Sequence, residues 1–214
     1  MEPCDCETAF SGVLRALHNQ CLYSNALYAL AGVFGIAALP GWWKLIGAYV
    51  VGVAGVSYVH HTQEKALGLG AAVWSRLDST LATGLVIAGA AALVGLLARP
   101  DTRKEVGFFF GGAVFLLAIY SLGIYFASRV AAQKAGESND EIMSWGGGPL
   151  LAQRQQGEAA AQQPSDICSK QRYRVDYLAL HSSWHGLSAA AILLMLVALR
   201  RALVSLAPAA YTTF

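Results

Sequence analysis

The sequence predicts an all-α integral membrane protein, a helical bundle with about five transmembrane helices. Of its 214 residues, 56% are hydrophobic and 13% are charged, whereas soluble domains carry about 25% charged residues. Several uncharged apolar runs reach the ~20 residues that a helix needs to cross a bilayer. We therefore expect one transmembrane domain over residues 1–214. The net charge of +2 is small and scattered, so it indicates no nucleic-acid partner.

Five segments are long and apolar enough to be predicted as spans. They are 22–39, 42–61, 77–98, 106–127 and 178–199. The first is ended by Pro40-Gly41, which favours a turn. A short charged loop, 99–105, separates the third span from the fourth.

Two other regions differ in composition from the spans. Residues 1–21 are predicted to be an extramembrane N-terminal segment, and apolar residues recur within them at a helical spacing, which favours a short amphipathic helix on the membrane surface. Residues 129–176 are charged and rich in Gly, Gln and Ala. We expect a polar loop there, with the composition of a disordered segment.

Basic residues in short loops predict the orientation of the spans. All of these residues fall on one side of the predicted membrane, opposite the acidic N-terminus. They are Lys44, Arg99, Arg103, Lys104, Arg200 and Arg201. The positive-inside rule then places the N-terminus outside the cytosol and the C-terminus inside it. This orientation fits the endoplasmic reticulum–Golgi system or the plasma membrane.

The same orientation brings the unusual polar residues to one depth. His60 and His61 lie at the outer end of the second span, and Asp78 lies at the outer start of the third. His181 and His185 lie four residues apart, on one face of the outer half of the last span. Ionisable side chains within a membrane span usually mark a functional site.

These residue types suit a zinc site of the catalytic kind. Three neutral imidazoles with one open position bind zinc tetrahedrally, and the predicted ligands are His61, His181 and His185. His61 is preferred because it shares a helix face with Ser57, while His60, about 100° away, is kept as a substitute. Asp78 would accept a proton or orient a ligand, and Ser57 would bind the water or a developing oxyanion.

The pattern resembles the CREST superfamily of membrane proteins. Its elements here are Ser57-x3-His61, Asp78 and His181-x3-His185, in that order along the spans. The superfamily contains alkaline ceramidases, the progestin and adipoQ receptors, and the myomaker family. The resemblance implies a shortened version of a seven-helix bundle, with one pair of helices lost where residues 129–176 now lie.

The N-terminal region is similar to that of alkaline ceramidases, on Cys6-Glu7 and Ser24-Asn25. That likeness implies a disulfide from Cys6 or Cys21 to Cys168. It gives calcium little support, because Glu7, with Asp5, is the only acidic cluster available and His18 stands where a carboxylate is expected. The long spacing from His61 to Asp78, by contrast, is nearer the receptor and myomaker branches.

The resemblance implies a zinc-dependent membrane hydrolase that cleaves lipid amides such as ceramides, with a membrane lipid as its substrate or ligand. The alternative is a non-enzymatic, myomaker-like protein for membrane remodelling or fusion, in which the zinc site is structural. A receptor-like protein is a third interpretation. The sequence predicts no particular oligomeric state.

Overall fold

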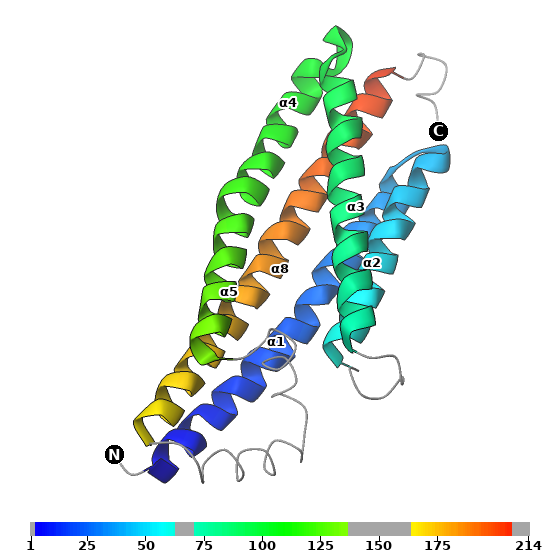
Figure 1. Ribbon diagram of the computed structural model, residues 1–214. Coiled ribbons are helices and arrows are strands. Elements are labelled where there is room, and N and C mark those ends of the chain that lie inside the picture. Colours follow the sequence, from blue (N-terminus) through cyan, green and yellow to red (C-terminus); the bar gives the residue numbers. More distant parts are fainter. Residues whose placement is uncertain (1–2, 63–70, 137–163, 207–214) are drawn as a thin grey trace.

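A computed structural model of the chain describes residues 3–62, 71–136 and 164–206, and every element in them is a helix (Figure 1). The predicted all-α class is therefore confirmed. The elements are α1 (Pro3–Ala38), a 3-10 turn η1 (Gly41–Trp43), α2 (Lys44–Thr62), α3 (Ala71–Leu97), α4 (Pro100–Phe115), a π-helical segment η2 (Leu116–Ser121), α5 (Leu122–Ala135) and α8 (Pro164–Leu206).

Helix α8 lies at the centre of the bundle, with α1 on one side and α4 and α5 on the other (Figure 1). The helices α1, α3 and α8 run in one direction, and α2 and the α4–α5 helix run in the other (Figure 1). Small residues allow neighbouring helices to approach α8 closely. Ala191, Ala198 and Ala202 on α8 are fully buried.

Four of the described helices are long and apolar enough to cross a membrane. They are Phe10–Ala38, Gly41–His61, Arg76–Leu97 and Cys168–Leu206. The predicted span 106–127 falls on α4, η2 and α5, where the apolar stretch within one regular helix is only Val106–Phe115. Large apolar side chains such as Phe108, which is 81% exposed, cover the outside of the bundle. Such a surface is compatible with a lipid environment.

The turn between α3 and α4 is closed by side chains of α4 that bond to the end of α3. Pro100 is at the start of α4, where a missing N–H has no cost. Thr102 donates from its hydroxyl to the carbonyl of Leu96, and Arg103 donates to the carbonyl of Leu97 at 3.1 Å. The last carbonyls of α3 are therefore satisfied inside the charged loop.

Helices α1 and α2 pack backbone against backbone at three glycines. A Cβ atom built on Gly32 would lie 2.7 Å from the carbonyl oxygen of Gly47, and one on Gly47 would lie 2.7 Å from the carbonyl carbon of Gly35. Both separations are too short for real carbon atoms. Glycine therefore sets the distance between these helices. The turn that joins them contains Gly41 at φ +54°, a conformation that glycine adopts readily.

Two expectations about the flanking regions need correction. Residues 3–21 form no separate surface helix, because they are the first turns of α1. Their apolar stripe packs inside the bundle instead, where Leu14 lies in one cluster with Ala131 of α5 and Tyr177 of α8. The predicted loop 129–176 is helical at both ends, up to Ala135 and from Pro164. Its middle lies outside the described residues.

The structure excludes one of the two expected disulfide partners of Cys168. Cys21 is a free, buried thiol whose Sγ donates to the carbonyl of Leu178 at 3.3 Å, so it does not pair with Cys168. Cys168 is disulfide-bonded. The side chain of Cys6 lies outside the described residues, and its pairing with Cys168 stays a prediction.

We expect Gly47→Leu to destabilise the protein, because a side chain there would push α1 and α2 apart. Overpacking of this kind costs about 1–3 kcal/mol, and it would be measured as a lower thermal unfolding temperature in detergent. Gly52→Leu on the same helix is the matched control, since a Cβ at Gly52 meets nothing within 4 Å. Equal stability of the two variants would contradict the role given to Gly47.

Candidate metal centre

Three histidine side chains from two helices meet inside the bundle. His61 lies at the end of α2, and His181 and His185 lie one turn apart on α8. One ring nitrogen of each lies within 4.8 Å of the other two. The ring centroid of His61 is 5.2 Å from that of His181 and 5.3 Å from that of His185. The structure thus brings together the three histidines that the sequence singled out.

The donor atoms fit a metal ion. Both ring nitrogens of His61 and the Nε2 atom of His181 are buried, and among the described residues they have no hydrogen-bond partner. A buried polar atom without a partner costs about 1–3 kcal/mol. Three neutral imidazoles that converge on one point offer lone pairs to a divalent cation, and zinc takes such nitrogen ligands. A metal ion would therefore satisfy atoms that the protein alone leaves unsatisfied.

The third converging histidine, His185, is hydrogen-bonded to helix α1. Its Nδ1 atom lies 2.7 Å from the hydroxyl oxygen of Ser24. That hydroxyl donates to the carbonyl oxygen of Cys21 at 2.6 Å. The imidazole of His185 is almost completely buried, with 2% of its surface exposed.

Asp78 and Ser57 lie next to each other, on α3 and α2. The Ser57 hydroxyl donates a hydrogen bond to the Asp78 carboxylate, and Ser57 is buried. His60 interacts electrostatically with the same carboxylate. Within the described residues, the group with converging nitrogens contains His61 and not His60. The geometry therefore favours His61 over its neighbour.

Sequence reasoning missed the contribution of α1 to the site. Tyr28 packs edge-on against His185, with ring centroids 5.7 Å apart, and its hydroxyl is hydrogen-bonded to Ser188 of α8. Cys21, Ser24 and Tyr28 recur every three or four residues, so they share one helix face. Polar residues at that spacing in an apolar segment could have indicated from the sequence that this face of α1 contributes to the site.

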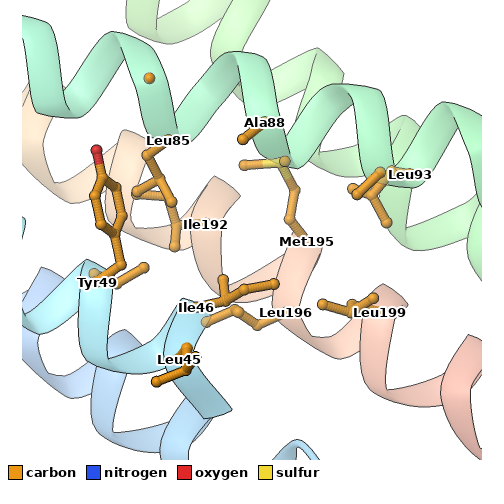
Figure 2. Close-up of a pocket in the computed structure, with 14 residues that line it drawn as sticks. Leu45, Ile46, Tyr49, Leu85, Ala88, Leu93, Ile192, Met195, Leu196 and Leu199 are labelled. Carbon is orange, nitrogen blue, oxygen red and sulfur yellow. The ribbon is translucent and has the colours of Figure 1, made fainter. Parts of the chain in front are cut away.

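An apolar pocket of about 380 Å³ lies between α2, α3 and α8, and its lining contains none of the three histidines (Figure 2). Its labelled lining residues are Leu45, Ile46, Tyr49, Leu85, Ala88, Leu93, Ile192, Met195, Leu196 and Leu199. Ile192 is seven residues beyond His185 on α8, about 10 Å along the helix. The volume lies within the range of small-molecule sites.

The chain matches no protein-family model, no curated protein and no solved structure in the comparisons made. The interpretation of the histidine cluster therefore rests on the geometry of this chain and on the chemistry of its side chains.

The convergence of His61, His181 and His185 predicts a bound metal. We expect the purified protein to contain about one zinc ion per chain, because three imidazoles complete a site of the catalytic type. His61→Ala, His181→Ala and His185→Ala should each lose the metal. The measurement is elemental analysis by mass spectrometry.

His60→Ala is the matched control, and it should keep the metal because His60 is outside the converging group. A wild-type protein without zinc, together with a His181→Ala variant of normal stability, would contradict a metal site here.

Proposed function

We propose that this protein is a zinc-dependent hydrolase of the membrane that cleaves the amide bond of a lipid such as a ceramide. The observation that carries the proposal is the arrangement of the site. Three histidines converge within 4.8 Å of one another, and Ser57, one turn before His61, holds the Asp78 carboxylate. An apolar pocket lies further along α8, between the helices. Each part has a counterpart in the hydrolysis of a lipid amide.

Zinc, held by His61, His181 and His185, would supply Lewis acidity and lower the pKa of a bound water to near 7. Asp78 would act as the proton carrier. It would take the proton that water loses and deliver it to the amine that leaves when the C–N bond breaks. The hydrogen bond from Ser57 to Asp78 supports a role for Ser57 in orienting this carboxylate. Its single hydroxyl proton is already donated, which argues against a resting oxyanion site at Ser57.

The apolar pocket supports a substrate with hydrocarbon chains. Burial of each methylene group contributes about 0.8 kcal/mol. The pocket lies about 10 Å from the histidines along α8, so an acyl chain placed in it would leave its polar end near the site. An amide carbonyl at that end would meet the side chains that carry the chemistry.

The directions of the helices support five crossings and the proposed orientation. Because α1 and α8 run in the same direction (Figure 1), an odd number of crossings is needed, and the α4–α5 helix supplies the fifth. Cys168 is disulfide-bonded, near the start of α8, and disulfides persist in oxidising compartments. A non-cytosolic N-terminal side, with the C-terminus in the cytosol, agrees with the basic residues at the opposite side.

Asp78→Asn is the test of the chemical step. The amide can still accept the bond from Ser57 but cannot carry a proton, so ceramide turnover should fall by about 10²–10⁴-fold. Zinc content should stay unchanged. The measurement is release of fatty acid and sphingoid base by purified protein in lipid nanodiscs, with Asp101→Asn at the start of α4 as the control.

Full turnover by the Asp78→Asn variant would contradict the proposed proton carrier. Wild-type protein that holds zinc, hydrolyses no lipid amide and promotes cell mixing on expression would contradict the hydrolase. That outcome would identify a non-enzymatic fusion protein with a structural metal.

Gly89→Leu tests the pocket as the site of the lipid chain. A Cβ at Gly89 would lie 3.7 Å from the sulfur of Met195, which lines the pocket. Displacing about two methylene groups of substrate costs about 1.6 kcal/mol, so KM for a long-chain amide should rise about tenfold. Gly95→Leu, on the same helix with nothing within 4 Å, should leave KM unchanged. An equal KM for the two variants would place the chain elsewhere.

A further inference from the structure

Helix α1 carries none of the three converging histidines, yet it makes the hydrogen bond that holds one of them. We propose that Ser24 is a positioning residue that keeps His185 in the tautomer with Nε2 free to bind a metal ion. The inference rests on the proposed zinc function and assigns the control of that site to a helix outside the ligand set.

The available protons leave His185 with its N–H on Nδ1. Ser24 has one hydroxyl proton, and it is donated to the carbonyl oxygen of Cys21 at 2.6 Å. The contact of 2.7 Å between the Ser24 oxygen and His185 Nδ1 must therefore use a proton from the ring. A neutral imidazole carries only one N–H. With that proton on Nδ1, the lone pair of His185 is on Nε2.

A second group of α1 also contacts this ring. His185 forms a hydrogen bond with the main chain of Cys21, so both Ser24 and Cys21 tie the ring to α1. Histidine ligands of metals almost always donate their other N–H to a fixed partner, and loss of such a partner lowers metal affinity about 10–100-fold. Ser24 occupies that position for His185.

The state of His61 makes the bond between Ser24 and His185 more important. In the part of the chain that the structure describes, both nitrogens of His61 lack a hydrogen-bond partner, so no protein group selects its tautomer. His185 is therefore oriented before a metal arrives, whereas His61 is not. The affinity of the site should therefore depend on the bond that keeps the His185 ring in place.

The position of Ser24 is itself fixed by neighbouring contacts between α1 and α8. One turn before Ser24, Cys21 donates to the carbonyl of Leu178. One turn after it, Tyr28 is hydrogen-bonded to Ser188. These bonds limit sliding and rotation of α1 against α8. The hydroxyl of Ser24 is thus held at a constant distance from the ring.

The test compares two buried serines that share the same local bond. Ser24 donates to the carbonyl three residues before it, and Ser128 does the same to Tyr125 at 2.7 Å. Only Ser24 also contacts a converging histidine. We expect Ser24→Ala to lower the zinc affinity about 10–100-fold, while Ser128→Ala leaves it unchanged. Ser24→Thr keeps a hydroxyl and should restore most of the affinity.

Zinc affinity would be measured on the full-length protein in detergent by competition with a chelator, and thermal unfolding of the metal-free protein would be measured in parallel. Wild-type affinity in Ser24→Ala would overturn the inference. A loss of affinity that Ser24→Thr does not restore, or that matches the loss in Ser128→Ala, would also overturn it. If His185→Ala binds zinc as tightly as the wild type, the metal site itself is wrong, which separates failure of the proposed function from failure of this inference.

Discussion

The contact between the parallel helices α1 and α8 holds the site in place. Along it, polar groups buried in an apolar bundle pair with one another, as in the bonds from Cys21 to Leu178 and between Ser24 and His185. Inside a membrane no water replaces a missing partner. Each of these bonds therefore limits how α1 can turn or slide on α8. This constraint fixes the orientation of the His185 ring.

The converging histidine on α2 depends on a different kind of contact. His61 is on α2, which approaches α1 through Gly32, Gly35 and Gly47 rather than through polar bonds. Gly47 is fourteen residues before His61, about 21 Å along the helix. A change in the spacing of α1 and α2 at Gly47 would therefore shift the position of His61 at the other end of α2. Close backbone packing and buried hydrogen bonds together set the distance between His61 and the rings on α8.

Much of this could be predicted from residue spacing. The all-α class followed from the uncharged runs, and the shared face of His181 and His185 followed from their spacing of four residues. The charged loop 99–105 marked the turn between α3 and α4. The directions of the helices also agree with the alternation that short loops imply.

What the sequence left open depends on contacts between segments far apart in the chain. The start of α1 was predicted as a surface helix because amphipathic spacing does not reveal what covers the apolar side. In the structure α5 and α8 cover it, and Leu14 is buried there. Ser24 was noticed for a family likeness, but its bond to His185 spans 161 residues. This bond can be recognised only when the rotation of α1 relative to α8 is known.

The position of Asp78 bears on whether the cluster is chemical or only structural. A metal that merely tied α2 to α8 would need the three imidazoles and nothing from α3. The structure adds a carboxylate from α3, held by Ser57 one turn before His61. Placing a charged group in an apolar bundle is costly. The proposed hydrolysis needs such a group, suited to moving protons, whereas a structural tie does not.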